Sequence, residues 1–176
     1  MEKTNITITN DLTTNNVQTT KNLIKNYLPI YINIKFLDKY LDSNVIKIPT
    51  RATPGSAGVD LVSLEQKNIY PNETVKFHTG ICMEIPAGYV GIIAARSGLS
   101  INSGLAPANK IGVIDEDYRG EIIVALHNHS NEPKTVNIGD KIAQMLFIKY
   151  EVPAFNIVGE LKNTVRGEGG LGSTGK

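Results

Sequence analysis

Apolar side chains occur along the chain in short runs rich in β-branched and aromatic residues, which predict strands rather than helices. Turn-forming Pro, Gly and Asn separate these runs. A spacing of roughly 8–12 residues from strand to strand is typical of an all-β sandwich, barrel or jelly roll. The predicted strands are 31–36, 74–77, 81–85, 89–94, 111–114, 121–129, 135–138 and 141–150. Residues 97–102 are the best candidate for a helical turn.

The two ends of the chain differ in composition from the middle. The first twenty residues contain seven Thr and four Asn, and they cannot bury enough apolar surface to offset the entropy of ordering. Residues 166–176 are dense in glycine. We therefore expect a disordered arm at 1–25, one folded domain at 26–160 and a glycine-rich tail at 161–176.

Charge and composition restrict the classes of partner. Eighteen Lys and Arg residues oppose seventeen Asp and Glu residues, and the net charge of +1 provides no general field for DNA or a membrane. No apolar run approaches the roughly 18 residues of a membrane span, and the N-terminus has no apolar secretory signal. The single cysteine, Cys82, is expected in the core. We expect a cytoplasmic protein (nuclear is possible in a eukaryote) without a stable nucleic-acid or membrane partner.

Two segments have the composition of a phosphate site. The tail 166–175 combines five glycines with two hydroxyls; exposed N–H groups of such a segment bind anions, and Arg166 adds a guanidinium suited to phosphate. Arg96, Ser97 and Gly98 follow a predicted strand and offer a cation, a hydroxyl and an N–H group. A disordered terminus and an ordinary strand-to-helix turn are the alternatives for these two segments.

Three further segments carry polar groups beside predicted strands. Residues 112–120 place Asp115, two more carboxylates and Tyr118 in what we predict to be the turn of a β-hairpin. A carboxylate held there has the chemistry to deprotonate a water. Asp60 enters one strand, and Gln144 interrupts another. On these residues alone, a solvated acidic turn and purely structural roles for Asp60 and Gln144 remain open.

The order of these five segments resembles the five ordered motifs of the trimeric dUTP pyrophosphatase family. The motifs are Gly-Ser-Ala-Gly-Val-Asp-Leu at 55–61, Arg-Ser-Gly-Leu at 96–99, Gly-Val-Ile-Asp-Glu-Asp-Tyr-Arg-Gly at 112–120, Lys-Ile-Ala-Gln at 141–144 and Arg-Gly-Glu-Gly-Gly-Leu-Gly-Ser-Thr-Gly at 166–175. The resemblance covers about Ile32 to Lys176. It implies an all-β jelly roll (β-clip) that forms a homotrimer with three shared active sites and hydrolyses dUTP to dUMP and pyrophosphate.

The resemblance also implies roles for single residues. Asp115 would activate the water that attacks the α-phosphorus, and Tyr118 would pack beneath the deoxyribose and exclude a 2′-hydroxyl. Asn109 and the backbone of the third motif would read the uracil edge. Magnesium would be held by substrate phosphates and waters rather than by side chains, and Asp60 would hold Arg96. The residues implied to contact substrate are Arg96, Ser97, Gly98, Asn109, Gly112, Val113, Ile114, Tyr118, Gln144, Arg166, Gly170, Leu171, Gly172, Ser173 and Thr174.

Three positions depart from the family pattern: Leu171 replaces the usual aromatic residue of the tail, Ala95 a proline and Lys141 an arginine. Loss of the aromatic stack on uracil predicts weaker substrate binding. One alternative is a dCTP deaminase, but those enzymes need a glutamate where this chain has Ala125. The other is a regulatory nucleotide-binding or protein-interaction homologue, in which the arm 1–25 would contact a partner.

Overall fold

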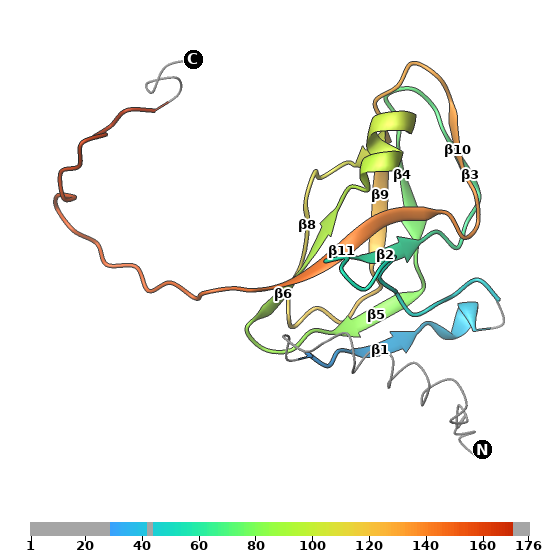
Figure 1. The fold of residues 1–176 in the computed structure, drawn as a ribbon, viewed down its shortest axis with the longest axis horizontal. Coiled ribbons are helices and arrows are strands. Elements are labelled where there is room, and N and C mark those ends of the chain that lie inside the picture. The colour runs from blue at the N-terminus through green and yellow to red at the C-terminus, as the bar shows by residue number, and fades with distance from the viewer. Residues whose placement is uncertain (1–28, 42–43, 171–176) are drawn as a thin grey trace.

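The computed structural model describes residues 29–41 and 44–170 (Figure 1). These residues form eleven strands with one short 3-10 helix and one short π-helical turn. The elements are β1 (Asn33–Phe36), η1 (Asp38–Tyr40), β2 (Val59–Val62), β3 (Lys67–Ile69), β4 (Thr74–His78), β5 (Ile81–Glu84), β6 (Tyr89–Ala94), η2 (Gly98–Asn102), β7 (Leu105–Pro107), β8 (Gly112–Ile114), β9 (Ile123–Asn128), β10 (Lys134–Val136) and β11 (Lys141–Lys149). The prediction of an all-β fold is confirmed, and the helical turn predicted at 97–102 is present as η2.

The strands of the described residues form two larger and two smaller antiparallel sheets. The larger sheets have the strand orders β2-β11-β6-β8 and β4-β9-β7, and the smaller ones pair β1 with β5 and β3 with β10. In the four-stranded sheet, β11 pairs with β2 on one side and with β6 on the other. This order places the strand that carries Gln144 between the strand that carries Asp60 and the strand that leads to Arg96.

One hydrophobic core collects side chains from both larger sheets. It follows the two-residue alternation of the strands: along β9, Val124, Leu126 and Asn128 are buried, while the residues between them are not. Phe77 of β4 and Met145 of β11 are completely buried. Burial of each large apolar side chain contributes about 1.5–3 kcal/mol, so this core supplies a stable frame for the loops between the strands.

The prediction that residues 112–120 form the turn of a β-hairpin is wrong. β8 pairs with β6, with Ile114 opposite Gly91, whereas β9 lies between β4 and β7 in the other large sheet. The loop after β8 therefore crosses from one sheet to the other. Neighbouring strands in a sequence often pair, but the apolar pattern of a strand does not specify its partner.

Smaller differences also separate the expected from the observed elements. The sequence pattern did not predict β3 or β7, because β3 has a single apolar residue, Ile69, and β7 ends in Pro107, which is disfavoured inside a sheet. Cys82, expected in the core, is only half-buried, since it lies at an outward position of β5 between the buried Ile81 and Met83. Among the residues described, no helix has the length and apolar character needed to cross a membrane.

Beyond β11 the chain leaves the body of the molecule. Residues 150–170 contain no strand or helix; Tyr150 is still bonded to Gly88, and the residues after it extend away from the sheets (Figure 1). The most exposed apolar side chains of this C-terminal segment are Val152, Phe155, Ile157, Leu161 and Val165. The predicted arm 1–25 and residues 171–176 of the predicted tail lie outside the described residues. The domain boundaries at 26–160 and 161–176 stay predictions.

Candidate active site

Asp60, in β2, connects two cations at one end of the four-stranded sheet. Its Oδ1 accepts a hydrogen bond from Arg96 Nε at 2.9 Å, and its Oδ2 lies 2.7 Å from Lys141 Nζ. The second contact is an ion pair without hydrogen-bond alignment, since the buried Oδ2 has no aligned donor in the described part of the chain. Arg96 Nη1 also donates to the Lys141 carbonyl at 3.2 Å. The Asp60 side chain is only 12% exposed, so it fixes the cations and presents little surface to a ligand.

Gln144 extends from β11 toward the same end of the sheet. Its Nε2 donates to the Ala95 carbonyl at 2.9 Å, directly beside Arg96. In the strand register, Gln144 lies opposite Ala94 of β6 and opposite Asp60 of β2. Three strands therefore bring Asp60, Arg96 and Gln144 together, and we call these three residues the phosphate side.

The turn η2 presents backbone groups next to the phosphate side. Ser97 and Gly98 are exposed, and the Ser97 hydroxyl makes no capping hydrogen bond. Ser100 N donates to the Arg96 carbonyl at 2.9 Å, which fixes the turn. Nothing lies within 4 Å of the point where a Cβ on Gly98 would stand, so a ligand can approach this backbone closely. A cation, a hydroxyl and accessible N–H groups together suit an anionic ligand.

Asp115 stands at the end of β8, where the loop toward β9 begins. Tyr118 N donates to the Asp115 carbonyl at 3.2 Å, which closes a turn. The Asp115 side chain is exposed, and no described residue donates a hydrogen bond to its carboxylate. With Val90 and Ile92 it lines a cavity of about 610 Å³, a volume typical of small-molecule sites. This carboxylate is therefore available to accept a proton from a water in the cavity.

Tyr118 is held by its own loop. Its hydroxyl donates to the Glu121 carbonyl at 3.0 Å. Its ring lies over Gly120, where an added Cβ would come within 3.0 Å of the ring edge and closer still to the hydroxyl, so this position requires glycine. The Glu121 side chain, 10% exposed, is anchored in turn by Gly80 N and His78 Nδ1, each at 2.8 Å. The Tyr118 ring therefore has a defined place in the loop.

Asn109 lies in a turn between β7 and β8. Lys110 N donates to the Pro107 carbonyl at 3.0 Å, and Lys110 has a φ of 63°. The Asn109 Nδ2 atom lies 3.4 Å from the point where a Cβ on Gly112 would stand. A side-chain amide thus lies beside Gly112, the first residue of the edge strand β8, and can offer both a donor and an acceptor there.

Within one chain, Asp115 and Arg96 lie at different ends of β6. Ile114 is opposite Gly91, near the beginning of the strand, whereas Arg96 follows Ala94 at its end. At about 3.3 Å per residue, Gly91 and Ala94 alone are separated by about 10 Å. Arg96 is also absent from the lining of the cavity that contains Asp115. The structure therefore brings the residues of the phosphate side together and places Asp115 with Tyr118, but it does not join the two groups.

The residues predicted from the glycine-rich tail lie apart from both groups. Arg166 and Gly170 belong to the exposed C-terminal segment, which extends away from the sheets (Figure 1). Arg166 Nε donates to the Gly169 carbonyl at 2.9 Å, a local contact within the segment. The remaining tail residues lie outside the described residues; they are Leu171, Gly172, Ser173 and Thr174.

Sequence reasoning missed two carboxylates of the loop after β8. Glu116 accepts a hydrogen bond from Gly88 N at 2.5 Å, and Glu121 accepts one from Gly80 N. Both bonds join residues that are far apart in the chain. The sequence shows that the loop is acidic, but it contains no signal of which carboxylates turn inward.

A model of the dUTPase family matches residues 44–175, a range that contains all five motifs. Among curated relatives, the deoxyuridine 5′-triphosphate nucleotidohydrolase of Desulfitobacterium hafniense is 52% identical over 132 residues, which are 73% of this chain and 87% of that protein.

Two solved structures share the fold. The dUTPase of Staphylococcus bacteriophage 80alpha with dUPNHPP superposes with a TM-score of 0.74 at 25% identity, over 84% of this chain and 100% of that one. A mutant dUTPase from phage phi11 of S. aureus, described as revealing the coordination of a structural Mg(II) ion, has a TM-score of 0.66 at 25% identity, over 74% of this chain and 98% of that one. The predicted jelly roll is therefore confirmed, and the chain belongs to the dUTPase family.

Proposed function

We propose that this protein hydrolyses dUTP to dUMP and pyrophosphate. The observation that carries the proposal is the exposed Asp115 carboxylate, which faces a ligand-sized cavity at the end of β8, in the middle of the range matched to the dUTPase family. Such an enzyme keeps uracil out of DNA and supplies dUMP for thymidylate synthesis. Its bacterial relative and its nucleotide substrate favour the cytoplasm as its compartment.

Asp115 acts as the general base. It takes a proton from a water molecule as the water oxygen attacks the α-phosphorus in line with the bond to the leaving group. A new phosphorus–oxygen bond forms, the bond from the α-phosphorus to the bridging oxygen breaks, and pyrophosphate leaves with the bonding electrons. The proton stays on Asp115 until it passes to solvent. A general base of this kind contributes about 10²–10⁴ in rate.

Residues before, in and after β8 select the nucleotide. The Tyr118 ring, fixed by Glu121 and Gly120, packs beneath the sugar and leaves no space for a 2′-hydroxyl. The Asn109 amide and the backbone of β8 pair with the uracil edge. A base with a mismatched edge leaves polar groups of this site unpaired, and such rejection is stronger than rejection by size.

The phosphate side binds the triphosphate, and its composition fits magnesium carried by the substrate. Asp60, its one carboxylate, is already engaged by Arg96 and Lys141. Ser97, Gly98 and Gln144 would then face phosphate oxygens, and Mg²⁺ would be held mostly by phosphates and waters rather than by side chains. When bound, the ion neutralises charge on the triphosphate. Arg96 and the N–H groups of η2 orient the chain of phosphates for in-line attack.

The separation of Asp115 from Arg96 supports a homotrimer with shared sites. A complete site then takes Asp115 and Tyr118 from one copy, the phosphate side from a second, and the tail from the C-terminal segment of a neighbour. Two surfaces that a single chain leaves open favour such contacts. One is the apolar C-terminal segment, and the other is the face of the four-stranded sheet where Val113 and Ile148 are 58% and 47% exposed.

Pyrophosphate release from dUTP, dTTP, dCTP and UTP, with and without magnesium, tests the proposed activity. We expect rapid release from dUTP alone, dependence on magnesium, and no ammonia from dCTP. Asp115→Asn should lower kcat more than about 100-fold while a non-hydrolysable dUTP analogue still binds, because an amide cannot take the proton. Equal turnover of all four nucleotides, or normal turnover by Asp115→Asn, would contradict the proposal.

A further inference from the structure

Glu116 directly follows Asp115 and turns inward. It is half-buried, although carboxylates on loops are normally exposed. Its Oε2 accepts a hydrogen bond from Gly88 N at 2.5 Å. Contact with the Glu116 carboxylate raises the pKa of the nearby Tyr150 hydroxyl, as do burial and the negative charges of Asp115 and Asp117. One carboxylate thus contacts two groups that are distant in the sequence.

The two partners of Glu116 are also bonded to each other. Tyr150 N donates to the Gly88 carbonyl at 3.2 Å. Gly88 has a φ of +79°, a conformation that glycine adopts without strain, and it ends a turn that Tyr89 N closes on the Pro86 carbonyl at 3.1 Å. Glu116 and Tyr150 are therefore both hydrogen-bonded to Gly88, and we call these three residues the Glu116 junction.

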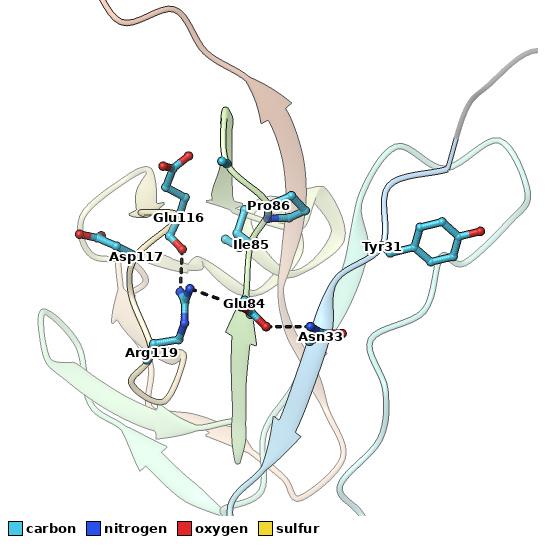
Figure 2. Close-up of a pocket in the computed structure, with 9 residues that line it drawn as sticks. Tyr31, Asn33, Glu84, Ile85, Pro86, Glu116, Asp117 and Arg119 are labelled. Atoms are coloured by element: carbon cyan, nitrogen blue, oxygen red, sulfur yellow. Dashed lines mark hydrogen bonds and ion pairs between the residues drawn. The ribbon is translucent and has the colours of Figure 1, made fainter.

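The main chain of Glu116 is held from the opposite side. Arg119 Nη1 donates to the Glu116 carbonyl at 2.6 Å, and Arg119 Nη2 lies 3.9 Å from Glu84 Oε1. Figure 2 shows these contacts, with Arg119 between the Glu116 carbonyl and Glu84 at the edge of a cavity of about 400 Å³. The side chain of Glu116 is thus fixed to the turn after β5, and its carbonyl is held by Arg119 of the same loop.

This arrangement matters for Asp115 because no described residue holds the Asp115 carboxylate. The position of that carboxylate depends on its main chain, which is anchored before it by the pairing of Ile114 with Gly91 and after it by Glu116. Asp115, Glu116 and Tyr150 also line the same cavity. A shift of the loop by about 1 Å is enough to cost a large factor in the rate of the chemical step.

We propose that Glu116 is a positioning residue: through Gly88 and Tyr150 it fixes the main chain that carries Asp115 and ties it to the first residue of the C-terminal segment. The inference rests on the proposed role of Asp115 as general base. It adds a physical link between the loop that carries Asp115 and the C-terminal segment, because Tyr150 directly follows the last residue of β11.

Steady-state kinetics of the full chain with dUTP and magnesium test this role. Glu116→Ala should lower kcat about tenfold, while binding of a non-hydrolysable dUTP analogue stays within about twofold of wild type. Glu116→Gln should retain most of kcat, since an amide oxygen still accepts from Gly88 N. Tyr150→Phe should lower kcat about threefold, because the hydroxyl that lies near the Glu116 carboxylate is removed. Adding Tyr150→Phe to Glu116→Ala should cause no further loss, because both changes remove the same junction.

Glu132→Ala is the matched control, because the Glu132 side chain is 79% exposed and, among the described residues, forms an ion pair with the neighbouring Lys134, while its main-chain hydrogen bonds are kept by alanine. It should keep wild-type kcat. The inference is overturned if wild-type protein hydrolyses dUTP and Glu116→Ala turns over like Glu132→Ala. It is also overturned if Glu116→Gln loses as much as Glu116→Ala, or if the losses from Tyr150→Phe and Glu116→Ala multiply. Failure of wild-type protein to release pyrophosphate would instead refute the proposed function.

Discussion

Gly58 lies directly against Gln144: a Cβ on Gly58 would come within 2.7 Å of Gln144 Oε1 and 3.3 Å of Gln144 Cβ. Glycine at this position of the first motif therefore lets the amide of the fourth motif reach the Ala95 carbonyl. The two motifs are far apart in sequence, but β2 and β11 bring them into contact.

Gly58→Ala should displace Gln144 and weaken the phosphate side. We expect kcat/KM for dUTP to fall about tenfold. Gly55→Ala in the same loop is the control, since nothing lies within 4 Å of a Cβ at that position. Equal kinetics for the two variants would show that the place of Gln144 does not matter for turnover.

Asp60→Ala should leave Arg96 and Lys141 beside each other without their shared anion. Because the Asp60 carboxylate is largely buried while its two cations are partly exposed, the free energy of unfolding should fall by about 1–2 kcal/mol. KM for dUTP should rise as Arg96 loses its fixed orientation. Urea denaturation and steady-state kinetics measure the two effects; a variant with wild-type stability and KM would contradict the role given to Asp60.

Tyr118→Phe keeps the ring but removes its hydrogen bond to the Glu121 carbonyl. The ring should then move more freely beneath the sugar, and the ratio of kcat/KM for dUTP to that for UTP should fall about threefold to tenfold. Tyr70→Phe is the control, since Tyr70 is 59% exposed and lies on the surface turn between β3 and β4. An unchanged ratio in Tyr118→Phe would show that the Tyr118 hydroxyl does not contribute to discrimination between dUTP and UTP.

Acid should destabilise the protein partly through Glu65. Burial raises the pKa of this carboxyl, but hydrogen bonds from Lys67 Nζ and His78 N outweigh it and hold the pKa below its ordinary value. A lower pKa in the folded state means that the unfolded state binds more protons. The stabilisation is complete above the unfolded-state pKa and is lost as the pH falls through the folded-state pKa.

Glu65→Gln should therefore flatten the acid side of a plot of unfolding free energy against pH, while stability near neutral pH falls. Urea denaturation at a series of pH values measures this. Glu132→Gln, at an exposed site, should keep the wild-type slope. An identical slope in Glu65→Gln would mean that other carboxylates cause the acid sensitivity.

The sequence predicted the strands and the chemistry of the motifs better than the contacts between them. β5, β6 and β11 have alternating or continuous apolar runs of four or more residues, and each was predicted within two residues of its bounds. The pairing of β8 was predicted incorrectly, because pairing depends on the whole sheet rather than on local pattern.

The site was predictable only as far as its motifs extend. Asp115 and Arg96 could be named from their residue types and their order, but their separation along β6 requires the strand register. Glu116 and Glu121 could not be found, because their partners, Gly88 and Gly80, are glycines whose N–H groups carry no sequence signal. Tertiary hydrogen bonds to the backbone are invisible in composition and spacing.

A subunit-mixing experiment tests most directly whether one site takes Asp115 and Arg96 from different copies. Asp115→Asn and Arg96→Ala should each be nearly inactive alone. When equal amounts are unfolded together and refolded, about a quarter of the sites should combine an intact Asp115 from one variant with an intact Arg96 from the other. We predict recovery of about a quarter of wild-type pyrophosphate release from dUTP; a mixture as inactive as its two components would contradict the shared site.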